Sequence, residues 1–259
     1  MPFTLGAWRE DIDQAGAWAN ITALNDAHLN VVGDIIHVPA LNKIVALAGM
    51  IDTTVAQFAR LTSPSLRRRS ALNVAPLNGQ AAAAQVMNPA GHNVVDLRTN
   101  PVELVVGENL ICETFANPAA VQDQTMLVCF ADGPITPVTG AIFTVHGVSA
   151  TAAVANIWTN VPIVLDADLA RGKYQLVGMR AQSATMVAAR VVGPANIWRP
   201  GCPGATLVAD QASKIFRYGN MGVWGEFEDT DAGTIDILCN AADAAQEFYF
   251  DLIQIREGA

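Results

Sequence analysis

The stretch Thr234-Ile-Asp-Ile-Leu-Cys239 decides the fold class of this chain. Ile235 and Ile237 point to one face and Asp236 points to the other, which is the two-residue period of a β-strand. The stretch Gln246–Arg256 behaves in the same way at first, with Phe248, Phe250 and Leu252 on one face. Its apolar residues then change to the opposite face, which indicates a bulge or a strand that is covered on both sides.

Similar short apolar runs occur in both halves of the chain, and prolines and glycines separate them. In the second half, strands are expected at 141–149, 156–165, 172–182, 184–193, 205–209, 214–219, 222–228, 233–239 and 246–256. In the first half, the runs are 31–38, 43–51, 93–98, 101–106, 108–116 and 124–131. Eight or nine short strands in about 120 residues is the number of a jelly roll. The sequence therefore predicts an all-β fold, a jelly-roll β-sandwich with two rolls in tandem.

Two features divide the chain into segments. Residues 5–29 have apolar residues at helical spacing, so residues 1–30 are predicted to form an N-terminal helical arm. The stretch Asp132–Gly140 contains two prolines and two glycines, which favours a hinge. The expected organisation is an arm over 1–30, a first β-sandwich over 31–135 and a second over 136–259. Shorter helical candidates lie at 52–66 and 81–84.

Composition points to a protein that assembles. The chain has 259 residues, of which 51% are hydrophobic and only 15% charged, so little polar material is present to cover its surface. The net charge of −9 argues against a chain that binds nucleic acid over its whole surface. No basic segment followed by an apolar run begins the chain, and no apolar stretch is long enough to span a bilayer. Synthesis in a host cytoplasm is therefore expected.

Chemically reactive residues are scattered. No catalytic motif is present and the four histidines are isolated, so we expect no enzyme activity, no cofactor and no metal site. The acidic stretch 226–231 fits a solvated turn better than a calcium site. Four cysteines without a CxxC pair are expected to be buried thiols, with a disulfide left open. These are Cys112, Cys129, Cys202 and Cys239.

Two groups of residues are candidates for assembly contacts. Trp8 and Trp18 lie on the predicted arm, which either packs on the body or reaches a neighbouring subunit or a lipid surface. Arg67, Arg68 and Arg69 form the one run of three cations. That run is compatible with a solvated loop, with carboxylates of a neighbouring copy, and with phosphates or anionic lipid.

These features together resemble the major capsid proteins of icosahedral viruses, particularly the jelly-roll and double jelly-roll shells of tailless phages. The resemblance is carried by the arm at 1–30, by Asn100–Phe130 as the closing strands of a first roll, and by the strands over 141–256. It implies a structural subunit of a bacteriophage virion, forming homotrimers within an icosahedral shell. Its partners would be other copies, other capsid proteins, and an internal membrane or the genome on the inner face.

The alternative from another functional class is a carbohydrate- or receptor-binding β-sandwich, such as a lectin-like module or a spike. Such a protein would expose aromatic side chains on loops to stack on sugars. The candidates for that role are Trp158, Trp198 and Trp224.

Overall fold

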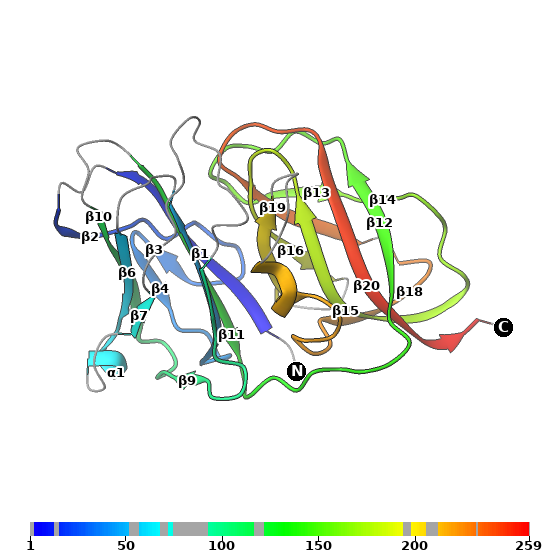
Figure 1. The fold of residues 1–259 in the computed structure, drawn as a ribbon, viewed down its shortest axis with the longest axis horizontal. Coiled ribbons are helices and arrows are strands. Elements are labelled where there is room, and N and C mark those ends of the chain that lie inside the picture. Colours follow the sequence, from blue (N-terminus) through cyan, green and yellow to red (C-terminus); the bar gives the residue numbers. More distant parts are fainter. Residues whose placement is uncertain are drawn as a thin grey trace.

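A computed structural model describes residues 3–12, 16–51, 57–67, 72–74, 93–116, 122–193, 198–205, 212–231 and 233–258. The described part is an all-β fold with sandwich-like packing, as the sequence predicts at this level. Its helical elements are the single turn α1 (Pro64–Arg67) and the 3-10 helix η2 (Ala212–Phe216). Figure 1 shows two bodies side by side, one from each half of the chain.

The N-terminal half forms a sandwich of two sheets, which we call the N-sandwich. One sheet, the inner sheet, has the order β1-β11-β5-β8, with β9 beside β5. Its strands are β1 (Phe3–Ile12), β5 (Lys43–Ile51), β8 (Asn93–Asp96), β9 (Val102–Glu103) and β11 (Gln122–Ala131).

The other sheet of the N-sandwich, the outer sheet, has the order β3-β4-β10-β6-β7, with β2 also beside β10. Its strands are β2 (Trp18–Asn20), β3 (Val31–Val32), β4 (Ile35–His37), β6 (Gln57–Thr62), β7 (Leu72–Val74) and β10 (Asn109–Ala116).

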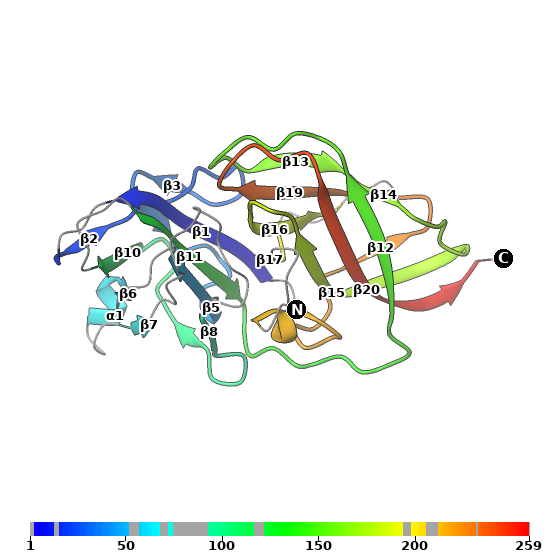
Figure 2. The ribbon, with the colours of Figure 1, turned by 45° about the horizontal axis from the view of Figure 1, so that its top comes forward.

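The C-terminal half, the C-sandwich, is one bent nine-stranded sheet in which a short parallel pair between β15 and β17 joins two groups of strands. The junction sheet, β13-β19-β16-β17, lies against the N-sandwich, and the far sheet, β14-β12-β20-β15 with β18 beside β15, lies away from it (Figure 2). The strands are β12 (Phe143–Ser149), β13 (Thr159–Pro162), β14 (Val164–Leu165), β15 (Gly172–Gln182), β16 (Met186–Val192), β17 (Gly201–Ala205), β18 (Gly225–Glu228), β19 (Thr234–Cys239) and β20 (Gln246–Glu257).

The two halves share one strand order. In the N-sandwich, β2 and β4 pair with the same edge of β10 and are counted as one strand. If the eight main strands of each half are then numbered along the chain, one sheet of each half has the order 1-8-3-6 and the facing sheet has the order 2-7-4-5. In the N-sandwich these are β1-β11-β5-β8 and β2/β4-β10-β6-β7. In the C-sandwich they are β12-β20-β15-β18 and β13-β19-β16-β17. The strands β3, β9 and β14 are additions at the edges.

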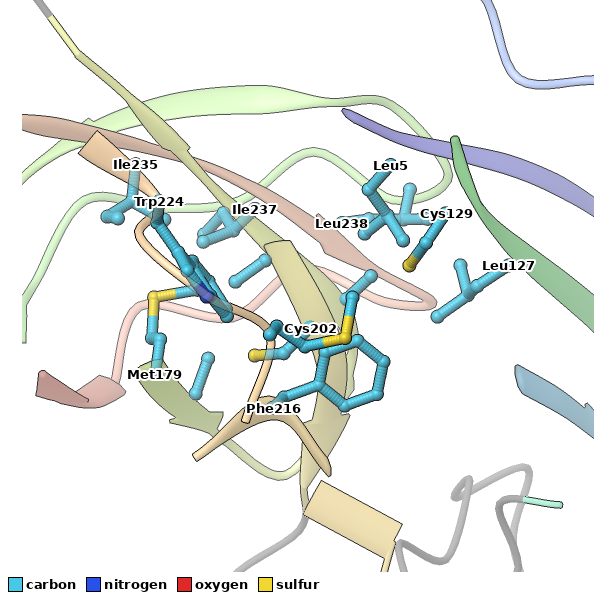
Figure 3. Packing of buried hydrophobic residues seen from close by; sticks show 14 of the residues in the cluster. Leu5, Leu127, Cys129, Met179, Cys202, Phe216, Trp224, Ile235, Ile237 and Leu238 are labelled. Atoms are coloured by element: carbon cyan, nitrogen blue, oxygen red, sulfur yellow. The ribbon is translucent and has the colours of Figure 1, made fainter. Parts of the chain in front are cut away.

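The inner sheet is covered on both faces. Trp8 and Met126 point into the N-sandwich, whereas Leu5, Leu127 and Cys129 point toward the C-sandwich and join its core. Figure 3 shows these three side chains beside residues of the C-sandwich. Complete burial of one such leucine is worth about 1.5–3 kcal/mol, so the contact between the sandwiches is part of the folded core.

The predicted helical arm is wrong. Residues 3–12 form β1, which pairs with β11 over its whole length, and residues 18–20 form β2. Trp8 is fully buried in the N-sandwich core. Because β1 is covered on both faces, its apolar residues do not alternate with polar ones, and the spacing that remains imitates a helix. The arm over 1–30 is therefore not a separate segment, since β1 and β2 belong to the two sheets of the N-sandwich.

Four smaller predictions have different outcomes. The helix expected within 52–66 is replaced by β6 and the single turn α1, and the strand expected at 214–219 is largely η2. Residues 81–84 lie outside the described residues. In β20, the register against β15 shifts between Lys173 and Tyr174, so Ile255 falls at a bulge. The last strand therefore contains a bulge, although the bulge follows Ile253, where the change of face begins.

Candidate functional site

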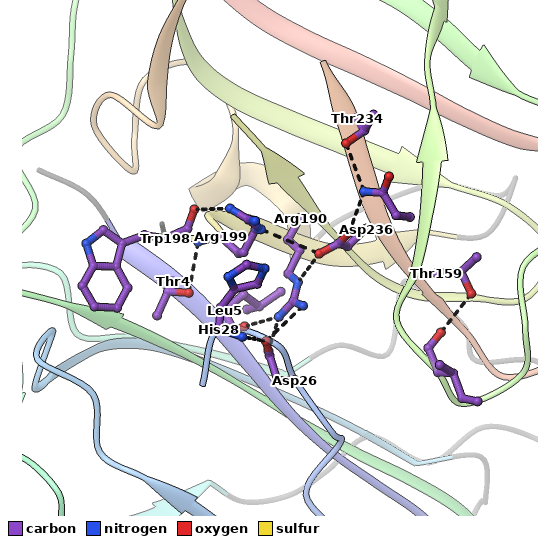
Figure 4. Close-up of polar contacts among 12 residues, drawn as sticks. Thr4, Leu5, Asp26, His28, Thr159, Arg190, Trp198, Arg199, Thr234 and Asp236 are labelled. Carbon is purple, nitrogen blue, oxygen red and sulfur yellow. Dashed lines mark hydrogen bonds and ion pairs between the residues drawn. The ribbon is translucent and has the colours of Figure 1, made fainter. Parts of the chain in front are cut away.

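A buried cluster of charges joins the two sandwiches. Arg190 on β16 donates from Nε to Asp236 on β19 at 3.1 Å, and its terminal nitrogens bond to Asp26 of the N-sandwich. The same guanidinium donates to the carbonyl oxygen of Leu5 on β1 at 3.4 Å. The side chains of Arg190 and Asp26 are each 2% exposed. A buried cation is tolerated only where its donors meet acceptors, and Figure 4 shows them converging from both halves.

A second arginine reinforces the junction. The backbone NH of Arg199 donates to Oγ1 of Thr4 at 3.2 Å, and its carbonyl accepts from the NH of Leu5 at 2.9 Å. Its Nε lies 3.9 Å from the Asp236 carboxylate. Burial lowers the pKa of Arg199 from its ordinary value. Burial, followed by the nearby Arg199 charge, also lowers the pKa of His28, which lies beside the cluster in Figure 4.

Four residues of the junction sheet form a set that we call the junction quartet. Asp236 lies directly between Asn160 and Arg190 in the register of β13, β19 and β16. Asn160 donates from Nδ2 to Asp236 at 2.8 Å. The Cζ atom of Arg190 lies 4.0 Å from the ring centroid of Trp158, which is a cation–π contact. The quartet is therefore Trp158, Asn160, Arg190 and Asp236.

The outer sheet carries the same set at equivalent positions. Glu113 lies directly between Asn20 and Arg60 in the register of β2, β10 and β6. Arg60 donates to Glu113 from two nitrogens, at 2.9 and 3.2 Å, and this bond raises the pKa of Arg60. The Cζ atom of Arg60 lies 4.1 Å from the ring centroid of Trp18. We call Trp18, Asn20, Arg60 and Glu113 the outer quartet. It departs from the junction quartet in two ways, since Glu113 replaces the aspartate and binds two nitrogens of its arginine, and Asn20 donates to Asp34.

The surroundings of the two quartets differ. Arg190 and Asp236 of the junction quartet are buried, whereas Trp18 in the outer quartet is 37% exposed. Phe115 lies between Trp18 and Phe58 in the cross-strand register, with ring centroids 5.7 and 6.3 Å away. Phe58 is also exposed. The outer sheet therefore presents a row of aromatic side chains next to an ion pair on the side of the molecule farthest from the C-sandwich (Figure 1).

Polar side chains also gather on the far sheet. His146 on β12 lies beside Tyr249 on β20, and their ring centroids are 4.7 Å apart. Nδ1 of His146 lies 2.5 Å from the carboxylate of Asp166, which follows β14. Glu247 accepts hydrogen bonds from Gln182 at 2.5 Å and from Tyr249 at 3.3 Å. The face therefore carries two carboxylates, and Asp166 is the more exposed of them, with 58% of its side chain accessible.

The residues singled out in the sequence lie in different environments. Trp8 belongs to the core, so it makes no assembly contact as a free arm residue would. Trp18 is exposed in the outer quartet, as a contact residue requires. Arg67 is exposed at the end of α1, whereas Arg68 and Arg69 lie outside the described residues.

The three tryptophans of the sugar-binding alternative lie on loops, but none of them is exposed. Trp224 is buried in the core, where Phe3 packs edge-on against it at 5.1 Å. Trp158 and Trp198 are partly buried, the first under Arg190 and the second against the N-sandwich core. All three precede a strand, and the packing that covers their rings cannot be read from the sequence.

Sequence reasoning missed both quartets, although one signal was present. Trp18-Ala-Asn20 and Trp158-Thr-Asn160 have the same pattern and stand 140 positions apart in the sequence. The first strands of the two sandwiches, β1 and β12, begin at the same separation along the chain. The arginine and carboxylate partners come from other strands. Only the strand order brings them together.

The remaining candidates are placed as follows. The acidic stretch 226–231 belongs to β18 and the turn after it, where Glu226 pairs with Lys173 and Glu228 with Arg256. All four cysteines are buried free thiols. Within the described ranges, no three His, Cys, Asp or Glu side chains are grouped as a metal site would need. Nor does that part of the chain contain a helix long and apolar enough to cross a membrane.

Comparison with known proteins places the chain in no family. No family model matches it, and no curated protein does. Among solved structures, a Paenibacillus xanthan lyase is similar at 11% sequence identity and a TM-score of 0.23. The match covers 95% of this chain and 25% of that chain, so this chain spans about a quarter of the lyase's length.

Proposed function

We propose that the chain is a structural subunit, the major capsid protein of an icosahedral virus, built from two jelly rolls in tandem. The observation that carries the proposal is the repeated strand order. A jelly roll has eight strands in two facing sheets, and the orders 1-8-3-6 and 2-7-4-5 occur in both halves of this chain. The packing of one roll on the other through a continuous core supports a single rigid building block.

The surface supports the same function. Apolar side chains that a monomer would leave in water are exposed on the outer sheet, where Trp18 and Phe58 lie in one row. Exposed apolar patches of this kind mark contacts with other macromolecules. In a shell, each copy covers such patches with its neighbours, and closed symmetry removes the free surfaces. The homotrimer within the shell, and contacts with other capsid proteins or with a membrane or genome inside, belong to this proposal.

The sugar-binding alternative has less support, because the three tryptophans that motivate it are buried or partly buried. The two functions predict different particles. Purified shell subunits form trimers and larger closed assemblies, whereas a sugar-binding module stays a small oligomer.

Sedimentation velocity and negative-stain electron microscopy at several protein concentrations test the proposal. We expect discrete oligomers that grow into closed particles far larger than the 27.4 kDa chain. A monodisperse monomer at every concentration, indifferent to dilution, would contradict it.

A further inference from the structure

We propose that the outer quartet of one copy docks on the far sheet of a second copy, with Arg60 bonding to Asp166. This inference rests on the proposed function, for which it names the contact between neighbouring copies. Its source is the repeated quartet, which already makes one such contact within the chain.

The contact within the chain is the template. Arg190 of the junction quartet crosses from the C-sandwich to the N-sandwich and bonds to Asp26 and to the carbonyl oxygen of Leu5. One acceptor belongs to β1, the first strand of the N-sandwich, and the other lies beside it. Asp26 comes two residues after Leu24, whose NH donates to the carbonyl of Ala7 on β1 at 2.9 Å.

The C-sandwich carries an equivalent acceptor. Asp166 lies beside β12, the first strand of the C-sandwich, and its NH donates to the carbonyl of His146 on that strand at 3.1 Å. Asp166 follows Asn160 by the six positions that separate Asp26 from Asn20. The far sheet therefore presents a carboxylate at the position equivalent to the acceptor that receives Arg190.

The exposure and the charges of the two faces fit a second copy of the chain as the partner. Arg190, Asp236 and the side chain of Asp26 are buried between the two sandwiches, whereas Trp18 and Asp166 are accessible in the single chain. Glu247, close to Asp166 through His146, adds a second negative charge to the acceptor face, where Arg180 over the ring of Tyr249 is the one nearby cation among these side chains. Arg60 is held in place by Glu113 and Trp18 in the way that Asp236 and Trp158 hold Arg190, so little side-chain freedom remains to be lost on docking.

The two faces cannot meet within one chain. The outer sheet and the far sheet lie at opposite ends of the molecule in Figure 1. A contact between two different faces is heterologous, and such contacts form a ring when the rotation closes and a filament when it does not. If the outer quartet docks on the far sheet, the contact between two copies therefore repeats the contact between the N-sandwich and the C-sandwich within one copy.

The experiment exchanges charges without removing the local ion pair. In the variant Arg60→Glu/Glu113→Arg, the outer quartet keeps a salt bridge and the net charge, but a carboxylate replaces the guanidinium that faces Asp166. Addition of Asp166→Arg restores opposite charges across the contact. A matched control, Arg256→Glu/Glu228→Arg, exchanges another exposed ion pair at the end of β20.

We expect the first variant to sediment as a monomer at concentrations where the wild type and the control assemble, and the triple variant to recover assembly. Circular dichroism and melting curves check that each variant folds. If the exchanged pair prevents folding, Arg60→Gln/Glu113→Gln is used, and at least a tenfold weaker association is expected. Assembly that is unchanged in the folded variants overturns the docking contact and leaves the shell proposal intact. A wild type that stays monomeric overturns both.

Discussion

Arg190 and Asp26 form the one ion pair in the described chain whose two side chains are each 2% exposed, and it joins one sandwich to the other. A charged pair gains from burial only if its geometry is good and its other donors are satisfied. Here the remaining donors of Arg190 reach Asp236 and the carbonyl of Leu5. The pair therefore selects one relative placement of the two sandwiches, since any other placement would leave a guanidinium buried without acceptors.

Replacement of Asp26 by asparagine tests this role. We expect Asp26→Asn to lower the free energy of unfolding by about 3 kcal/mol, at the lower end for a broken buried pair because Asp236 still binds Arg190. Chemical denaturation measures the change. The matched control is Asp166→Asn at the exposed equivalent position, where we expect at most about 1 kcal/mol for the monomer. Equal losses in the two variants would contradict a structural role for the junction pair.

The free energy of unfolding should depend on pH through His28, which lies beside the junction. Its pKa is lowered in the folded chain by burial and by Arg199, so the unfolded chain binds the proton more tightly. Stability from this group is therefore complete above the ordinary pKa of 6.5 and declines as the pH falls below that value. Melting temperatures between pH 7.5 and 5 should show this decline, and His28→Gln should flatten it.

The control for the pH experiment is His37→Gln, which removes a histidine from β4 in the outer sheet. That variant should keep the wild-type decline between pH 7.5 and 5. A profile for His28→Gln that runs parallel to the wild type would show that His28 does not link protonation to stability.

A third prediction concerns Gly219, which contacts the segment that connects the two sandwiches in the chain. Gly219 has φ +77°, its carbonyl accepts from the NH of Val138 at 2.8 Å, and a Cβ there would lie 2.2 Å from the carbonyl oxygen of Val138. Gly33 also has a positive φ, but a Cβ there would meet nothing within 4 Å. We expect Gly33→Ala to cost about 1 kcal/mol from backbone strain alone. Gly219→Ala should cost clearly more, because the link between the sandwiches has to shift. Similar losses in denaturation would contradict the close approach.

The all-β class of the fold could be predicted because some strands of the C-sandwich alternate apolar and polar residues, and others begin or end at a glycine. Residues 172–182 and 246–256 are strands almost as expected, with Gly172 at the start of the first and Gly258 just after the second. The hinge at Asp132–Gly140 also leads from the last strand of one sandwich to the first strand of the other.

The arm was not predictable, because β1 is a strand whose two faces are both apolar. A strand between two cores has no polar face, so its sequence carries no period of two. The quartets were hidden for another reason. Arg60 and Glu113 are 53 positions apart, and Arg190 and Asp236 are 46 apart, so no local pattern shows that they meet. Whether Trp18 is exposed and Trp158 covered depends on tertiary packing, which neither tripeptide encodes.

Two tryptophans provide the last prediction, since they separate folding from assembly. Trp8 is fully buried and its Nε1 donates to the carbonyl of Asp34 at 2.9 Å. We expect Trp8→Ala to lower the free energy of unfolding by about 3–5 kcal/mol, as large-to-small substitutions in a core do. Trp18 is 37% exposed and packs on Phe115 and Arg60. Trp18→Ala should cost the single chain only about 1 kcal/mol, the worth of an aromatic pair.

Association should show the reverse order. In the docking contact, Trp18 takes the place that Trp158 has at the junction, so its removal should weaken association between copies at least tenfold while the chain remains folded. Trp8→Ala should leave the association constant of its folded fraction unchanged, because its side chain reaches no surface. Denaturation curves and sedimentation equilibrium on the same two variants measure both quantities. If Trp18→Ala associates like the wild type, the aromatic row on the outer sheet faces solvent in the assembled protein and the contact between copies lies elsewhere.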